Sequence, residues 1–193
     1  MAEVIMAIVM NLTLAMTGAN EATLLFAGDA MMHQAQLDAA KALGHGRSYD
    51  YSDCFTPVSR TIGEADYAVV NLETPLGYGG FTGYPCFCAP TAYAEALRKA
   101  GFDLFLTANN HTLDRRDKGL KLTVHLLDSL GIPHIGTYTS ADERRKRLPK
   151  IVDVNGFRIA MLNYTYGTNG FEVRSDAVVD YIDKAQIKAD IDS

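Results

Sequence analysis

The sequence predicts an α/β (α+β) domain in which short strands and helices alternate. Short runs of apolar and β-branched residues recur between helical stretches, and most of these runs end at glycine, asparagine or aspartate. An Asn155-Gly156 pair between two apolar runs adds a strong β-hairpin signal. With 193 residues, 48% hydrophobic and 21% charged, the chain has the composition of one globular domain. We therefore expect a mixed sheet of parallel strands and a hairpin, flanked by helices.

The elements are expected in the order βαβαβαβ followed by the hairpin. The expected strands are 23–27, 67–70, 103–108 and 132–136, the expected helices are 31–43, 56–64, 91–100 and about 120–130, and the hairpin pairs 150–154 with 157–162. Pro57 after Thr56 marks a helix start with Thr56 as its N-cap. Gly101 and Gly131 mark helix ends. The other expected segments are a glycine-rich loop over 77–83, a basic loop over 144–147 and the start of a helix over 185–193.

Residues 1–20 stand apart from the domain expected over residues 21–193. Val4 to Met16 is mostly apolar and small residues follow it, which is typical of a secretory signal. However, Glu3 precedes this stretch, and the first basic residue of the chain is Lys41. Three interpretations therefore stay open: a signal or a remnant of one, an extra N-terminal segment, and a start codon assigned at the wrong position.

Charge and cysteine content exclude two classes of protein. Eighteen basic and 23 acidic residues give a formal net charge of −5, which argues against nucleic acid as a partner. The three cysteines, Cys54, Cys86 and Cys88, cannot all pair with one another, and Cys86 and Cys88 are too close in sequence for a relaxed bridge. A disulfide-stabilised fold is therefore not expected.

Candidate metal ligands follow three successive strands. Asp29 follows the first strand, Asn71 and Glu73 follow the second, and Asn110 with His111 follows the third. The carboxyl ends of parallel strands meet at one edge of a sheet, so these side chains should converge. Carboxylate, amide oxygen and imidazole together suit Mn, Fe, Zn or Mg. The competing interpretation is structural, because Asp and Asn are common wherever strands turn into loops.

Four motifs around these positions strengthen the functional interpretation. They are Gly28-Asp29-Ala30-Met31-Met32, Val70-Asn71-Leu72-Glu73-Thr74-Pro75-Leu76, Ala100-Gly101-Phe102-Asp103 and Ala108-Asn109-Asn110-His111-Thr112-Leu113-Asp114. In order and spacing they resemble the capsule-synthesis protein CapA family, which is tied to poly-γ-glutamate capsules. The resemblance covers about residues 23–193.

That family looks like a branch of the calcineurin-like metallophosphatases, so the resemblance implies a fold and a chemistry. The implied fold is a mixed β-sheet sandwich flanked by helices, with one or two divalent metal ions at the strand ends. The resemblance implies that Asp29, Glu73 and Asn110 are metal ligands. It also implies that His111 protonates the leaving group of a phosphoester or related bond, and that Asp114 orients His111.

Three further residues are expected to bind substrate. Arg115 and Arg116 follow the proposed site directly, where a cation could contact a phosphate or a polyglutamate carboxylate. Tyr164 follows a strand at the same edge. The expected partners are an anionic capsule polymer or a phosphoester, together with other capsule-synthesis proteins, and the expected location is the cell envelope, membrane-associated or secreted, with the cytoplasm as the alternative.

The sequence also departs from the phosphatase pattern. Met31 stands where the first motif has histidine, and His33 lies two residues too far along to replace it simply. Glu73 replaces the usual aspartate of the second motif. The remaining histidine ligands would lie beyond Ser193, so we expect a domain and a metal site that are incomplete at the C-terminal end. A non-catalytic scaffold or polymer-binding subunit with a decayed metal site is therefore the alternative to a metal-dependent hydrolase.

Overall fold

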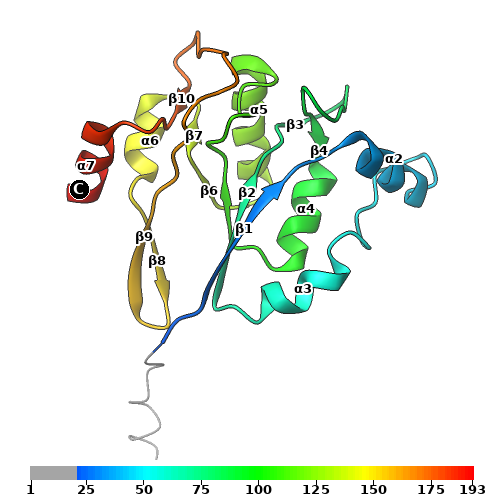
Figure 1. Ribbon diagram of the computed structural model, residues 1–193, viewed down its shortest axis with the longest axis horizontal. Coiled ribbons are helices and arrows are strands. Elements are labelled where there is room, and N and C mark those ends of the chain that lie inside the picture. Colours follow the sequence, from blue (N-terminus) through cyan, green and yellow to red (C-terminus); the bar gives the residue numbers. More distant parts are fainter. Residues whose placement is uncertain (1–20) are drawn as a thin grey trace, which may run out of the picture.

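A four-stranded parallel sheet forms the centre of the protein in a computed structural model that describes residues 21–193 (Figure 1). Its strands lie in the order β1-β2-β5-β6, with β1 at Leu24–Ala30, β2 at Tyr67–Leu72, β5 at Leu104–Leu106 and β6 at His134–Ile135. All three neighbouring pairs are parallel. Because the strands follow one another in chain order, crossovers of one hand carry the connecting helices to the same face.

The main core lies between the sheet and this helical face. Four helices contribute to it: α2 (Gln34–Leu43), α3 (Thr56–Gly63), α4 (Thr91–Ala100) and α5 (Arg116–Ser129). From the sheet, Ala68, Val70 and Leu72 of β2 point into this core, whereas Val69 lies in the core of the opposite face. This alternation is the period-two pattern of a strand that is buried on both sides.

The β-hairpin packs across the other face of the sheet. Strand β8 (Lys150–Val154) pairs antiparallel with β9 (Phe157–Met161), and positive φ angles of 52° at Asn155 and 84° at Gly156 confirm the expected type I′ turn. The expectation that the hairpin belongs to the same mixed sheet is wrong, because it forms a two-stranded sheet of its own. Its apolar side chains Val152, Val154 and Met161 instead cover Val69, Leu104 and Ile135 of the parallel sheet.

Shorter elements complete the described part of the chain. These are β3 (Leu76–Gly77) paired with β4 (Ala89–Pro90), β7 (Thr137–Tyr138) paired with β10 (Val178–Val179), α6 (Ala141–Arg147) and α7 (Lys184–Asp192). The basic run 144–147 lies in α6 and not in the expected loop. The Ser140 side chain accepts a hydrogen bond from the Glu143 backbone N–H and so caps this helix. This capping signal was missed because the run of charged residues is typical of a solvated loop.

Three helix starts differ from the expected ones, and one of them is α5, which begins at Arg116 and not near residue 120. Helix α2 begins at Gln34 and not at Met31, because His33 has extended backbone angles and donates its backbone N–H to the Gln36 side chain at 2.7 Å. In α3, Phe55 occupies the N-cap position and Thr56 is the first helical residue. The Thr56 hydroxyl donates to the Ser52 carbonyl instead of capping the helix.

The mixed α/β class is confirmed, with parallel and antiparallel pairs of strands. Among residues 21–193, no helix has the length and apolar character needed to cross a bilayer. The expectations for Val4 to Met16 lie outside the described residues.

Candidate functional site

Polar side chains from three strand ends meet at the carboxyl edge of the parallel sheet. Asp29 lies near the end of β1, Glu73 directly follows β2, and the segment 109–114 follows β5. Asp29 is exposed, whereas Glu73, His111 and Asp114 are buried. We call Asp29, Asn71, Glu73, His111 and Asp114 the strand-end site.

The Asn71 amide joins the two carboxylates of the site. Its Nδ2 donates to Asp29 Oδ1 at 2.6 Å and to Glu73 Oε2 at 3.1 Å. Its Oδ1 accepts from Asn109 Nδ2 at 3.1 Å, and Asn109 Nδ2 also donates to the Leu72 carbonyl at 3.0 Å. Asn109 thus sets which way the Asn71 amide faces, and this orientation holds both carboxylates close together.

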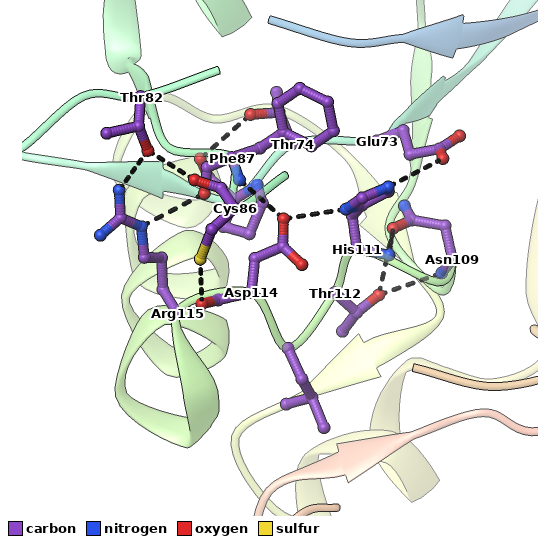
Figure 2. A network of polar contacts seen from close by, with 12 residues as sticks. Glu73, Thr74, Thr82, Cys86, Phe87, Asn109, His111, Thr112, Asp114 and Arg115 are labelled. Atoms are coloured by element: carbon purple, nitrogen blue, oxygen red, sulfur yellow. Dashed lines mark hydrogen bonds and ion pairs between the residues drawn. The ribbon is translucent and has the colours of Figure 1, made fainter. Parts of the chain in front are cut away.

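His111 lies between Glu73 and Asp114 (Figure 2). Its Nδ1 is 2.9 Å from Asp114 Oδ2, and its Nε2 is 3.9 Å from Glu73 Oε1. All three side chains are at most 8% exposed. A carboxylate that holds one ring nitrogen of a histidine fixes the orientation of the ring and leaves the other nitrogen for chemistry.

The glycine-rich loop between β3 and β4 closes over this histidine. The Phe87 backbone N–H donates to Asp114 Oδ2 at 2.7 Å, and the Phe87 ring meets the His111 ring edge-on with centroids 4.6 Å apart. Arg115 fixes the loop, donating to the Phe87 carbonyl and to the Thr82 hydroxyl (Figure 2). It also donates to the Gly80 carbonyl. The loop therefore keeps water away from one side of His111.

Burial makes the Glu73 carboxyl group an unusually weak acid. Desolvation first, and the neighbouring Asp29 carboxylate second, raise the pKa of Glu73 to about 7. Two carboxylates this close are stabilised either by a proton on Glu73 or by a cation between them. Perturbed carboxyl groups of this kind concentrate at functional sites.

This raised pKa makes stability depend on pH in the metal-free protein. In the unfolded chain Glu73 ionises near the ordinary glutamate pKa of 4.5, whereas the folded group keeps its proton to about pH 7. The folded state therefore binds more protons in this window, and the free energy of unfolding falls as pH rises from about 4.5 to about 7. The loss due to Glu73 is at most about 3 kcal/mol, at about 1.4 kcal/mol per pKa unit.

The Glu73→Gln variant should lack this loss. In urea unfolding with a chelator present, we expect the variant to be more stable than the wild type at pH 8 and to approach it near pH 4.5. Because the other carboxylates titrate in both proteins, the difference between the two curves isolates Glu73. If the free energies of unfolding of the two proteins change with pH in the same way, Glu73 does not have the raised pKa assigned to it.

The other residues expected at the site have different surroundings. Asn110 is half-buried, and within residues 21–193 its side chain makes no hydrogen bond, so Asn109 is the residue that contacts Asn71. The exposed Arg116 places its guanidinium 3.3 Å from the centroid of the Phe171 ring. Tyr164 donates its hydroxyl to Asp190 Oδ2 at 2.7 Å, which ties it to helix α7.

Two contributors to the site were not expected from the sequence. Asn109 and Asn110 are adjacent and chemically identical, so no sequence signal indicates which of them points toward Asn71. Phe87 lies 24 positions before His111 and reaches it only through the path of the glycine-rich loop. His33, weighed as a replacement ligand, has its ring centroid 5.1 Å from that of Phe87, whose ring also contacts His111.

The strand-end site supplies part of the donor set of a metal centre. Within residues 21–193, no group of three or more His, Cys, Asp or Glu side chains is arranged to hold a metal ion. Asp29 and Glu73 nevertheless supply two carboxylates that share one amide donor. Carboxylate oxygens suit a hard divalent cation.

Comparison with known proteins gives two matches. The family model of the bacterial capsule synthesis protein PGA_cap matches residues 23–192. The chain is also 29% identical over 151 residues to the capsule biosynthesis protein CapA of Bacillus anthracis, over 74% of this chain and 34% of that protein. The chain thus spans about a third of the length of this curated relative. These matches confirm the resemblance that the four motifs indicated.

Proposed function

The chain belongs to the bacterial capsule synthesis family PGA_cap, and from this premise we propose that its strand-end site is a metal-dependent hydrolase centre acting on a phosphoester or related bond in capsule polymer biosynthesis. One observation carries the proposal: a buried histidine is held by Asp114 on one side and faces Glu73 on the other, beside a second carboxylate. A structural turn needs neither a buried imidazole nor paired carboxylates.

His111 is the proposed proton carrier. Asp114 accepts from Nδ1 and fixes the tautomer, so the free Nε2 is the atom that gives or takes a proton at the site. Phe87 packs on the ring and excludes water from one face. Glu73 Oε1 lies 3.9 Å from Nε2, so the free nitrogen of the ring faces the carboxylate pair. These contacts support acid–base chemistry at the leaving group of a substrate.

Asp29 and Glu73 would hold a divalent cation, with Asn110 as a third candidate ligand. The ion would be Mn, Fe, Zn or Mg, and a second ion would need ligands beyond these three. Such an ion supplies Lewis-acid stabilisation of negative charge on a phosphoryl or carbonyl oxygen. The Asn71 amide keeps the two carboxylates together before a cation binds.

The substrate, partners and location follow as parts of the same proposal. We expect an anionic capsule polymer such as poly-γ-glutamate, or a phosphoester precursor, handled together with other capsule-synthesis proteins at the cell envelope. Arg116 is the exposed cation next to the site and is the one we assign to substrate binding. Arg115 acts on substrate only indirectly, because its guanidinium is used to hold the glycine-rich loop.

A calorimetric titration with Mn²⁺ tests the metal part of this proposal. We expect saturable binding to the wild type, at least tenfold weaker binding to Asn110→Ala, and no measurable binding to Asp29→Ala or to Glu73→Gln, because each removes an anionic ligand. Asp38→Ala, which removes an exposed carboxylate of α2, is the matched control and should bind like the wild type. Binding that is unchanged in Asp29→Ala would contradict the assignment.

A further inference from the structure

Three exposed tyrosines lie at the same edge of the parallel sheet as the strand-end site. Tyr78 and Tyr84 belong to the segment between β3 and β4, and Tyr166 lies three residues after Asn163, whose side chain accepts from the Ala108 backbone just past β5 (Figure 1). They are 80%, 70% and 78% exposed, the highest values of any large hydrophobic residue in the described part of the chain. Exposed aromatic residues that gather at one edge usually mark a binding surface.

Tyr84 is connected to the proposed proton carrier by a chain of ring contacts. Its ring stacks on the His33 ring with an interplanar angle of 29° and centroids 6.4 Å apart. It also meets the Phe87 ring, with centroids 6.3 Å apart. The Phe87 ring in turn contacts the His111 ring at a centroid distance of 4.6 Å. Only one ring therefore separates Tyr84 from His111.

The backbone on both sides of Tyr84 is held in place. Thr82 and Cys88 form an antiparallel bridge, with N–H···O distances of 3.1 and 2.9 Å. Inside this bridge the Cys86 thiol donates to the Asp114 carbonyl at 2.9 Å. Because the segment is already ordered, a ligand that binds to the Tyr84 ring has little loop entropy to remove.

The outer face of the Tyr84 ring is open to solvent. One face rests against His33, and an exposure of 70% leaves the other face uncovered. A planar ring on an ordered segment, supported on one face and free on the other, is the arrangement on which a nucleobase stacks. Such stacking needs no matching charge, since every base has a π-face.

The position of His111 brings a leaving group close to these rings. A general acid must lie within hydrogen-bond reach of the atom that it protonates. The His111 Nε2 atom faces Glu73, and the same ring contacts Phe87. A leaving group that takes a proton from His111 therefore lies beside the aromatic rings.

We propose that Tyr84, supported by His33, is a stacking platform for a planar base in the leaving group, which makes the substrate class a nucleotide. This inference rests on the proposed hydrolase function for the place of the phosphoester, whereas the stacking itself requires neither a metal ion nor turnover. Tyr84 does not touch the reacting atoms in this arrangement. It is a specificity-determining residue and not a catalytic one.

A titration of the full chain with adenosine in the presence of a chelator, followed by the NMR signals of the tyrosine rings, tests the stacking alone. Adenosine carries the base but no phosphate, so the charge of the strand-end site does not repel it. We expect saturable binding to the wild type, binding to Tyr84→Ala that is weaker by about fivefold or more, and binding to Tyr84→Phe within a factor of two of the wild type, because phenylalanine keeps the ring. Ribose, which has no base, should not bind saturably.

Phe157→Ala is the matched control, because Phe157 is an exposed aromatic residue beside the hairpin turn, outside the strand-end site. It should bind adenosine like the wild type. The inference is overturned if adenosine does not bind saturably, if ribose binds as tightly as adenosine, or if Tyr84→Ala and Phe157→Ala bind adenosine equally well. An amide spectrum of Tyr84→Ala that overlays on that of the wild type outside the segment between β3 and β4 establishes that the fold is intact.

Turnover with Mn²⁺ separates this inference from the proposed function. We expect Tyr84→Ala to lower kcat/KM for adenosine 5′-monophosphate by about fivefold or more, through a higher KM, and to leave kcat/KM for methyl phosphate within a factor of two. An equal loss for both esters would contradict the platform. Saturable adenosine binding that depends on Tyr84, without turnover of either ester, would support the platform and refute the hydrolase.

Discussion

The His111→Gln variant is expected to hydrolyse phosphoesters about 10²- to 10⁴-fold more slowly than the wild type, the usual contribution of a general acid or base. Glutamine can still donate a hydrogen bond to Asp114 and fills much of the same space, but it cannot release or take up a proton near neutral pH. The loss should appear in kcat, with p-nitrophenyl phosphate and bis(p-nitrophenyl) phosphate as substrates and Mn²⁺ present.

His125→Gln is the matched control for this experiment. His125 is an exposed histidine of α5, outside the strand-end site. Its replacement should leave turnover within a factor of two of the wild type. If His111→Gln keeps more than a tenth of the wild-type kcat, His111 is not the proton carrier, and the buried His111–Asp114 pair serves stability alone.

The second large effect is expected on stability. Asp114→Ala should lower the free energy of unfolding by about 2–4 kcal/mol, because it leaves two buried donors without an acceptor. Asp114 Oδ2 accepts from the Phe87 backbone N–H at 2.7 Å and lies 2.9 Å from Nδ1 of His111. The carboxylate thus connects the loop after β5 to the glycine-rich loop. Urea unfolding at pH 7 measures the loss.

Two further variants make the stability result specific. Asp114→Asn keeps an acceptor oxygen for the Phe87 N–H, so its loss should be smaller than that of Asp114→Ala. Asp53→Ala removes an exposed carboxylate and should change stability by no more than about 0.5 kcal/mol. Equal losses in Asp114→Ala and Asp53→Ala would show that the connection between the two loops contributes nothing.

Much of the fold could be predicted from local sequence signals. Helix α4 begins and ends at its expected residues, because Gly101 adopts a left-handed conformation with φ 118° directly after Ala100. The hairpin turn is equally local, since Asn155 and Gly156 tolerate positive φ angles. The order of the four parallel strands also agrees with the expected alternation.

The errors concern long-range packing and competing local signals. The sequence does not indicate whether the hairpin joins the parallel sheet or covers one of its faces. Its apolar residues Val152 and Val154 could be buried in either arrangement. The run 144–147 reads as a solvated charged loop, but the Ser140 cap and the ion pair of Arg144 with Asp180 make it a helix.

The sequence predicts which residues lie at the site, but it does not predict the directions of their side chains. The strand ends identify Asp29, Glu73 and His111, because parallel topology brings those positions together whatever the loops do. The conformation of the loops determines the remaining side-chain contacts of the site. The sequence does not indicate that Asn109 contacts Asn71, that Arg115 bonds to the glycine-rich loop, or that Tyr164 contacts Asp190 in helix α7.

The central claim is that the strand-end site hydrolyses an ester with the help of a divalent ion held by Asp29 and Glu73. Its most direct test is turnover of bis(p-nitrophenyl) phosphate by the purified wild type and by Asp29→Ala, each with Mn²⁺ and with a chelator. We predict turnover only for the wild type with Mn²⁺, and at least a hundredfold less for the other three combinations. Equal turnover by Asp29→Ala, or no turnover by a wild type that binds Mn²⁺, would contradict the account and favour a capsule-polymer scaffold.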